Sequence, residues 1–307
     1  ENASEVYGPM RLLTSYLFLY GVGTALAATL TLILVPKLWT RLPADQGRQF
    51  AVDAEKSQGK PVGAGVIFVP IFIGVCLLVT PFDPRIVATL ACVFLVMLAG
   101  YVDDRAGGLS EYFLGLVDLV IGVFGAMAVC GLEPYHLWLP FVKTELTISP
   151  WLFVPCAAVL IWFAINATNC TDGVDGLSAS LCGMGFIYLA GFLYGIVGHR
   201  EVARYLLVPH YGDAATWATL AFVMSGCLAG YLWYNANPSK VLMGDAGSRP
   251  MGLLLGVLVL ACGNPVLIFV VAGVVLVNGA TGILKVALLR FFKIWIFKEV
   301  RYPLHDH

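Results

Sequence analysis

The chain has 307 residues, of which 59% are hydrophobic and only 12% are charged, and its mean hydropathy is +0.85. This is more apolar surface than a soluble domain can bury, so the composition excludes a soluble globular protein and predicts one that lies in a lipid bilayer. The formal net charge of −1, without a long basic run, argues against a nucleic-acid partner.

Nine apolar runs suit membrane spans, since about 20 apolar residues cross a hydrocarbon core of roughly 30 Å. In chain order they are Leu12 to Pro36, Val62 to Thr80, Ile86 to Tyr101, Tyr112 to Cys130, Trp151 to Ile165, Leu177 to Val197, Thr216 to Tyr234, Met251 to Cys262 and Val266 to Phe291; the eighth is short. We therefore predict an all-α, polytopic helical bundle that forms a single membrane-embedded domain over residues 1–307.

Two further segments extend this prediction. The first apolar run is too long for a removable signal peptide and lacks a basic leader and a small-residue cleavage site, so we expect it to remain as a span. The connection from Gly131 to Pro150 alternates apolar and polar residues near its end, which predicts a small hairpin outside the membrane.

The distribution of basic residues predicts the orientation, because Lys and Arg are retained on the cytoplasmic side. With the N-terminus outside, the inner connections and tail carry 13 of the 18 basic residues: Lys37, Arg41, Arg48, Lys56, Lys60, Arg105, Lys240, Arg249, Lys285, Arg290, Lys293, Lys298 and Arg301. The outer connections carry the remaining 5, which are Arg11, Arg85, Lys143, Arg200 and Arg204. The opposite orientation would place most positive charges outside.

Five clusters of polar residues interrupt the apolar runs, and this topology places all of them in the cytoplasm. They are the loop ending in Gly59-Lys60-Pro61, the pair Asp103-Asp104, the stretch Asn166 to Gly176, the stretch Asn235 to Ser248, and the segment Pro303 to His307. Spans separate each cluster from the next, so only folding can bring them together. The pattern predicts an active site at the membrane surface.

The adjacent acids Asp103 and Asp104 close the third apolar run. Carboxylates at that depth are costly unless a cation or a water-filled cavity satisfies them. Neighbouring helical residues diverge by about 100°, so we expect the two acids to have different partners. The alternative is a solvated helix end without a function.

The stretch NATNCTDGVDG carries two amides, two acids and two glycines directly after an apolar run. Asn166 and Asn169 lie three residues apart, as do Asp172 and Asp175, so each pair can share one helical face. The glycines allow a ligand to approach the backbone closely. This combination indicates a site for a sugar, a base or a metal-bound phosphate rather than a structural loop.

The stretch NANPSKVLMGDAGS contains Asn235 and places Asp245 between Gly244 and Gly247, with Ser248 following. A helix that begins here points backbone N–H groups at the cavity, which suits a phosphate. An acid in that position indicates a divalent cation, because Mg²⁺ typically binds one or two protein carboxylates together with phosphate oxygens and water.

The closing segment places His305 and His307 on either side of Asp306. Alternate residues of an extended segment point the same way, so both imidazoles can contact one anion. A zinc site is the alternative, but the further Cys or His ligands that zinc takes are missing.

Together, Asp103-Asp104, NATNCTDGVDG, NANPSKVLMGDAGS and PLHDH resemble the motifs of the polyprenyl-phosphate N-acetylhexosamine 1-phosphate transferases. Within them the chain is most similar to the bacterial phospho-N-acetylmuramoyl-pentapeptide transferases (translocase I), over nearly its whole length and in the expected order. Asp306 stands where that family has a histidine. The family has one span more than the nine predicted here.

This resemblance implies transfer of phospho-MurNAc-pentapeptide from UDP-MurNAc-pentapeptide to undecaprenyl phosphate, which gives lipid I and UMP, with Mg²⁺ as cofactor, in the inner membrane of a bacterium. It implies that Asp245 binds Mg²⁺, that Asp103 and Asp104 engage the lipid phosphate, and that Asp172 supports catalysis. Substrate binding falls to Lys60, Asn166, Asn169, Asp175, Asn235, Gly244 and Ser248, with His305 and His307 near the pyrophosphate. Assembly into a homodimer is left as an open alternative.

Two alternatives remain. The same motifs suit a transferase that acts on UDP-GlcNAc. A membrane transporter also carries acids at span ends, but its acids should lie near the midplane on broken helices in repeated halves, and no internal repeat is visible here.

Overall fold

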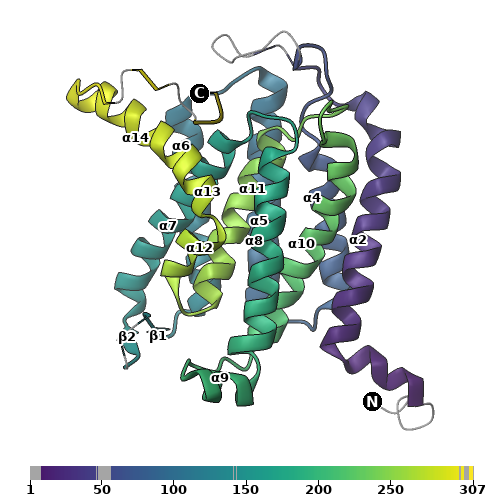
Figure 1. The fold of residues 1–307 in the computed structure, drawn as a ribbon, viewed down its shortest axis with the longest axis vertical. Helices are drawn as coiled ribbons and strands as arrows, with labels where there is room; N and C mark the ends of the chain where they lie inside the picture. Colours follow the sequence, from purple (N-terminus) through teal and green to yellow (C-terminus); the bar gives the residue numbers. More distant parts are fainter. Residues whose placement is uncertain are drawn as a thin grey trace.

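The computed structural model describes residues 8–45, 47, 57–140, 142, 144–296, 299–300 and 304–306. Nearly all the regular structure in these residues is helical, as predicted, and the long helices run side by side (Figure 1). The principal helices are α2 (Tyr16–Leu38), α4 (Gly65–Val79), α5 (Pro84–Ala106), α6 (Glu111–Cys130), α7 (Pro150–Thr171), α8 (Leu177–Phe192), α10 (Ala214–Asn235) and α11 (Asp245–Ala261).

The last predicted span is broken into short pieces. In order they are η4 (Pro265–Leu267), α12 (Ile268–Val271), α13 (Gly273–Val275), the π-helix η5 (Leu276–Ala280), α14 (Thr281–Ala287) and the π-helix η6 (Leu288–Phe292). The remaining short helices are η1 (Gly8–Thr14), η2 (Trp39–Arg41), the π-helix η3 (Leu193–Val197), α9 (Arg200–Leu206) and η7 (Leu304–Asp306).

Seven helical segments of the described chain are long and apolar enough to cross a membrane. Two further predicted runs form shorter helices, α4 with 15 residues and α11 with 17. Each of the nine predicted runs therefore contains helix. The predicted hairpin is also present, because β1 (Tyr135–Leu137) pairs antiparallel with β2 (Leu146–Ile148).

The ends of α5 follow local chemistry. Asp83 caps the first turn by accepting a hydrogen bond from the backbone N–H of Arg85 at 2.8 Å, and Pro84 occupies the first helical position. The helix ends at Gly107, whose φ of 73° is the left-handed conformation that glycine adopts without strain. Asp103 and Asp104 therefore belong to the last turn of the helix.

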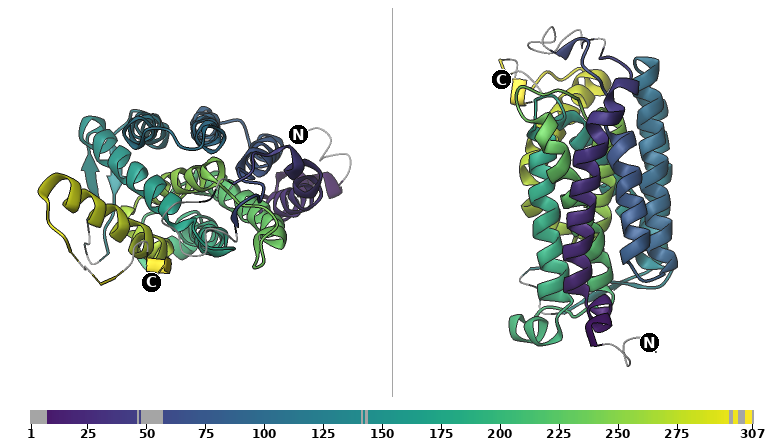
Figure 2. Two further views of the ribbon diagram at one scale, coloured as in Figure 1. Left: turned by 90° about the horizontal axis from the view of Figure 1, so that it is seen from above. Right: turned by 90° about the vertical axis from the view of Figure 1, so that its right-hand side faces the viewer.

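Helix α11 lies in the interior of the bundle, and every residue from Ala246 to Leu260 is buried (Figure 2). Glycines let the neighbouring helices approach it closely. A Cβ at Gly65, Gly100 or Gly252 would overlap backbone atoms of α11 or, for Gly252, of α7. Small residues of this kind are typical of helix contacts in membranes.

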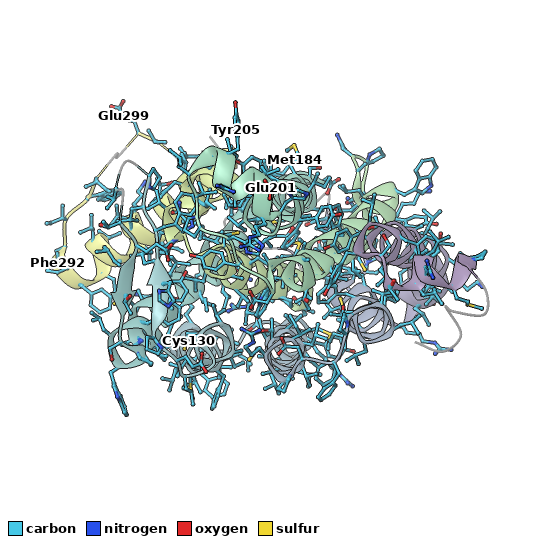
Figure 3. All side chains as sticks on the ribbon, turned by 90° about the horizontal axis from the view of Figure 1, so that it is seen from below. Cys130, Met184, Glu201, Tyr205, Phe292 and Glu299 are labelled. Atoms are coloured by element: carbon cyan, nitrogen blue, oxygen red, sulfur yellow. The ribbon has the colours of Figure 1, made fainter. Side chains whose placement is uncertain are left out.

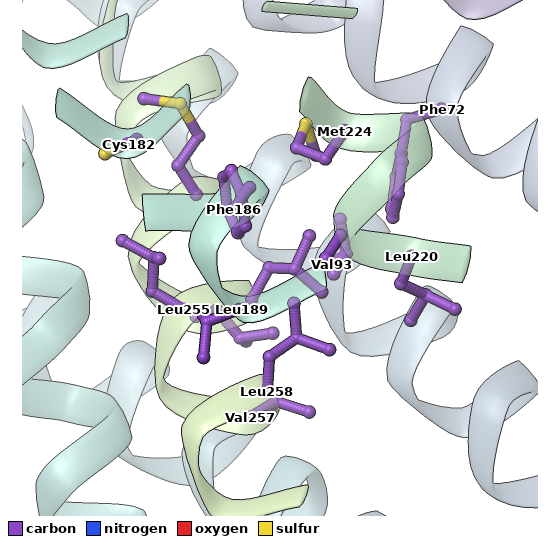
Figure 4. Close-up of a cluster of buried hydrophobic side chains, with 14 of the residues drawn as sticks. Phe72, Val93, Cys182, Phe186, Leu189, Leu220, Met224, Leu255, Val257 and Leu258 are labelled. Atoms are coloured by element: carbon purple, nitrogen blue, oxygen red, sulfur yellow. The ribbon is translucent and has the colours of Figure 1, made fainter. Parts of the chain in front are cut away.

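Apolar side chains fill the space around α11. Leu255, Val257 and Leu258 of α11 face a cluster that includes Phe186 and Leu189 of α8 (Figure 4). Apolar side chains also cover the outside, where Met184 and Phe292 point away from the bundle and are 60% and 69% exposed (Figure 3). Exposed apolar surface on a long helical bundle is what a lipid environment requires.

The loops that connect the helices lie at the two ends of the bundle. The first described helix η1, the β1–β2 hairpin and α9 lie at one end, and the last described helix η7 lies at the other (Figure 1). The C-terminal ends of α2, α5, α7 and α10 lie at the same end as η7. This is the end that carries the polar clusters.

Candidate functional site

Direct contacts join the polar clusters at this end. The Asp104 carboxylate binds the backbone at Asp245, and Lys60 lies beside Ser239 and Asp175. The prediction that folding brings the five clusters together is confirmed for their described residues. His307 and the Asp306 side chain lie outside the described residues.

Asp104 caps the start of α11. Its two carboxylate oxygens accept hydrogen bonds from the backbone N–H groups of Asp245 at 2.9 Å and Ala246 at 3.0 Å. Gly244, with φ 70°, has no side chain that would collide with this carboxylate, whereas a Cβ there would overlap it. The acidic pair and the glycine-framed Asp245 are therefore one structural unit.

Asp103 has different partners, as the divergence of adjacent helical residues predicts. Its carboxylate accepts a hydrogen bond from the backbone N–H of Leu109, in the loop after α5, and also faces the carboxylate of Asp245. Two carboxylates that face each other repel unless a cation or a proton lies between them. The Asp103–Asp245 pair is the point of the site that best fits a cation.

Mg²⁺ suits this donor set. The described residues contain no group of three or more His, Cys, Asp or Glu side chains that could hold a metal without help. Mg²⁺ does not require one, since it usually keeps several waters and binds one or two carboxylates together with substrate phosphates. Asp103 and Asp245 therefore fit a cation that is completed by a phosphate-bearing substrate.

Asp245 also makes a buried ion pair. Arg249, one turn further along α11, lies with its Nε 2.7 Å from Oδ2 of Asp245. The Nη1 atom of the same guanidinium is 2.5 Å from Oδ2 of Asp118 on α6. The Asp118 side chain is fully buried and that of Arg249 is 8% exposed.

Asp175 and Lys60 hold the loop after α10. Both oxygens of Asp175 accept hydrogen bonds from Ser239, one from its backbone N–H at 2.9 Å and one from its hydroxyl at 2.7 Å. Lys60 Nζ lies 3.0 Å from the Ser239 hydroxyl and 3.7 Å from Asp175. These bonds join three of the predicted clusters and leave the Lys60 ammonium at the rim of the site.

Asn235 is buried, and its amide contacts only the protein backbone among the described residues. Its oxygen accepts a hydrogen bond from the N–H of Gly176 at 3.0 Å, and its nitrogen donates to the carbonyl of Val241 at 3.0 Å. This amide orders the two loops that follow α7 and α10. A direct contact of Asn235 with a nucleoside stays a prediction.

The remaining residues of the stretch Asn166 to Gly176 lie at the end of α7. Asn166 donates to the carbonyl of Trp162 at 2.8 Å, and Asn169 lies 3.3 Å from the hydroxyl of Ser248, which itself donates to Gly244. Asp172 follows the last helical residue and is partly exposed. Asn166 and Asn169 therefore lie within α7, and Asp172 is the first residue of the loop that follows it.

His305 is fixed by Asn278 of η5. The Asn278 oxygen accepts the backbone N–H of His305 at 2.9 Å, so its amide nitrogen must donate to Nδ1 of the imidazole, also at 2.9 Å. A neutral imidazole with Nδ1 as acceptor carries its proton on Nε2. Nε2 lies against Gly173, where a Cβ would overlap it. Asn278 therefore holds the imidazole of His305 beside the loop after α7.

Three polar residues at this site were not predicted from the sequence: Asp118, Arg249 and Asn278. A signal was available, because Asp118 and Asn278 interrupt apolar runs, where a polar side chain is costly without a partner. Their partners became evident only from the packing of α6 and η5.

An apolar groove opens beside His305. It has a volume of about 420 Å³ and is lined by Leu177, Leu181, Gly273, Val274, Val277, Asn278, Leu304 and His305. Its walls come from the start of α8 and from the broken C-terminal segment. The groove therefore joins an apolar surface to the polar site.

Comparisons with known proteins agree with this arrangement. A model of glycosyl transferase family 4 matches residues 86–263. The phospho-N-acetylmuramoyl-pentapeptide-transferase of Treponema pallidum (strain Nichols) is 46% identical over 98% of this chain and 84% of its own length. Proteins of the same name from Helicobacter acinonychis (99% of this chain, 90% of the relative) and Nautilia profundicola (91% and 82%) are each 29% identical. The chain thus belongs to glycosyl transferase family 4 and, within it, to the phospho-N-acetylmuramoyl-pentapeptide-transferases.

Proposed function

We propose that this protein transfers phospho-MurNAc-pentapeptide from UDP-MurNAc-pentapeptide to undecaprenyl phosphate and so forms lipid I and UMP for peptidoglycan synthesis. Family membership over 98% of the chain supports the reaction. The observation that carries the proposal is the convergence of Asp103, Asp104 and Asp245 at the end of the bundle, where His305 also borders an apolar groove. Such a site suits a water-soluble nucleotide sugar that meets a lipid-borne phosphate.

The proposal includes a topology of nine spans in the plasma membrane, with the N-terminus outside and the site in the cytoplasm. The 13-to-5 distribution of basic residues supports this orientation. Helices α4 and α11 are short, but both pack against longer helices, so they count as spans here. A nucleotide sugar is a cytoplasmic substrate, which agrees with that side.

Phosphoryl transfer needs charge neutralisation and in-line positioning more than covalent protein chemistry. Asp245 and Asp103 would hold Mg²⁺, which would neutralise negative charge on the pyrophosphate. Asp104 fixes the start of α11 and hence the place of Asp245. The lipid phosphate is already ionised at neutral pH, so it needs orientation rather than removal of a proton.

The other predicted residues receive roles that their contacts support. His305 lies near the pyrophosphate in this proposal, with Asn278 as its positioning residue. Lys60 supplies positive charge at the rim, and Asp172 lies at the mouth of the loop after α7. Asp175 and Asn235 hold the loop after α10 by hydrogen bonds, on the side of the site that would bind the nucleoside. The apolar groove would take part of the polyprenyl chain.

The test is release of UMP by the purified protein in detergent or nanodiscs. We expect release to require UDP-MurNAc-pentapeptide and undecaprenyl phosphate together, to stop when EDTA removes divalent cations, and to be lost in the Asp245→Asn variant. Turnover of UDP-GlcNAc in place of the muramoyl substrate would move the protein to the other branch. UMP release by neither nucleotide sugar would contradict the proposed function.

A further inference from the structure

The guanidinium of Arg249 links two acids from different helices. Its Nε binds Asp245 on its own helix at 2.7 Å, and its Nη1 binds Asp118 on α6 at 2.5 Å. The Asp118 and Arg249 side chains are 0% and 8% exposed, so water screens this pair little. Arg249 contacts the two acids through different nitrogen atoms, which a lysine could not reproduce.

The charges of this group do not cancel. Asp118 and Asp245 each contribute −1 and Arg249 contributes +1, so the three side chains together carry −1. Without Asp118, the guanidinium would cancel the charge of Asp245. Without Arg249, Asp118 would be a buried unpaired carboxylate, which is strongly destabilising. The group therefore keeps one unit of negative charge, and Asp245, with a side chain that is 13% exposed, is its most exposed member.

The ion pair also restricts how Asp245 can bind a cation. Arg249 takes one lone pair of Oδ2 of Asp245, which leaves Oδ1 as the better placed ligand for a cation, and the carboxylate cannot rotate without breaking the bond. Mg²⁺ demands near-ideal octahedral geometry at about 2.0–2.1 Å, so a fixed single-oxygen ligand suits it. Asp103, which lies beside Asp245, would supply a second oxygen, since Leu109 bonds only its Oδ1 atom.

We propose that Arg249 is a positioning residue that fixes Asp245 as a single-oxygen ligand for a divalent cation, and that Asp118 is the counter-charge that offsets the positive charge of Arg249 near the cation. This inference rests on the proposed function, in which Asp245 binds Mg²⁺. It assigns a role to two residues that do not contact the substrate. Arg249 and Asp118 act only through Asp245.

The experiment measures Mn²⁺ binding to the purified protein in nanodiscs by electron paramagnetic resonance, together with kcat and thermal stability. Asp118→Asn keeps the shape of the side chain but removes its charge, so we expect Mn²⁺ affinity to fall at least about fivefold. The double variant Asp118→Asn with Arg249→Gln removes both charges, so affinity should return to within about twofold of the wild type. The kcat of the double variant should be below that of the wild type, because Arg249 no longer holds the carboxylate of Asp245.

The variant Arg249→Lys tests the contact geometry of the Arg249 side chain separately from its positive charge. It retains the positive charge but cannot bind both acids, so we expect Mn²⁺ affinity close to the wild type and a kcat lowered at least about tenfold. A purely structural link between α6 and α11 predicts another pattern, in which stability falls and the Mn²⁺ affinity of the folded protein stays unchanged in every variant.

The outcomes separate the two proposals. Unchanged Mn²⁺ affinity in folded Asp118→Asn overturns the inference and leaves the proposed function intact. Wild-type Mn²⁺ binding in Asp245→Asn overturns the metal assignment and the inference together. If Asp118→Asn does not fold, the double variant decides: wild-type affinity with lowered kcat supports the inference, and wild-type kcat overturns it.

Discussion

Replacing Asp104 with Asn should destabilise the start of α11. The variant keeps the shape of the side chain but offers one acceptor oxygen, where Asp104 offers two to the N–H groups of Asp245 and Ala246. Its amide nitrogen would face one of these donors. One charge-assisted hydrogen bond is lost and the other is weakened.

The loss follows from the bond energies. A hydrogen bond to a charged group contributes about 1.5–3 kcal/mol, and the attraction of a carboxylate to a helix N-terminus adds about 0.3–1 kcal/mol. Removing the charge also relieves repulsion from Asp103 and Asp245, which is worth about 1 kcal/mol in a partly solvated site. We therefore expect Asp104→Asn to lower the free energy of unfolding by about 1–3 kcal/mol.

The measurement is unfolding in mixed micelles by titration with a denaturing detergent, with Asp103→Asn as the matched control. Asp103 makes its backbone bond to Leu109 in a loop, and its replacement brings similar relief from repulsion. Its net effect should therefore be close to zero. Equal stability of the two variants would refute the proposed capping of α11 by Asp104.

Two further predictions concern His305 and the topology. Gly173→Ala places a Cβ against the imidazole of His305 and should lower kcat at least tenfold, equivalent to about 1.4 kcal/mol. Gly74→Ala, on a face of α4 with open space around it, is the control and should leave kcat unchanged; equal activity of both variants would remove His305 from the site. For the topology, an impermeant maleimide should label Ser110→Cys only from the cytoplasmic side and Thr144→Cys only from outside, both positions being exposed. The reverse pattern would place the site in the wrong compartment for a nucleotide sugar.

Hydropathy predicted where the helices run better than where they end. The predicted runs stopped at Tyr101 and Ile165, where polar residues begin, whereas α5 and α7 continue to Ala106 and Thr171. Backbone hydrogen bonding does not depend on side-chain polarity, so a helix persists until its backbone conformation changes. Asp103 and Asp104 consequently sit on a rigid helix end.

The site could be predicted as a set of residues but not as a set of contacts. The motifs placed Asp104 and Asp245 on the same side of the membrane, yet the bond between them spans 141 positions and depends on how α5 meets α11. Asp118 and Arg249 lie on helices whose rotation about their axes is set by packing, so their pairing had no sequence signal. The π-helix η5, which presents Asn278 to His305, was likewise not predicted, because the run from Val266 to Phe291 reads as one mainly apolar helix that includes Asn278.

The buried pair of Arg249 and Asp118 bears on how the chain enters the membrane during synthesis. Arg249 lies one turn from the start of α11, and burying its charge without a partner is costly, so α11 is a poor candidate to enter lipid alone. Its counter-ion lies 131 residues earlier in the chain, on α6, and Asp104 of α5 precedes both. When α11 is synthesised, Asp118 and Asp104 are already in the membrane. Asp118 can then pair with the guanidinium of Arg249, and Asp104 can accept hydrogen bonds from the first N–H groups of α11. The order of synthesis therefore provides α11 with its polar partners before it leaves the translocation channel.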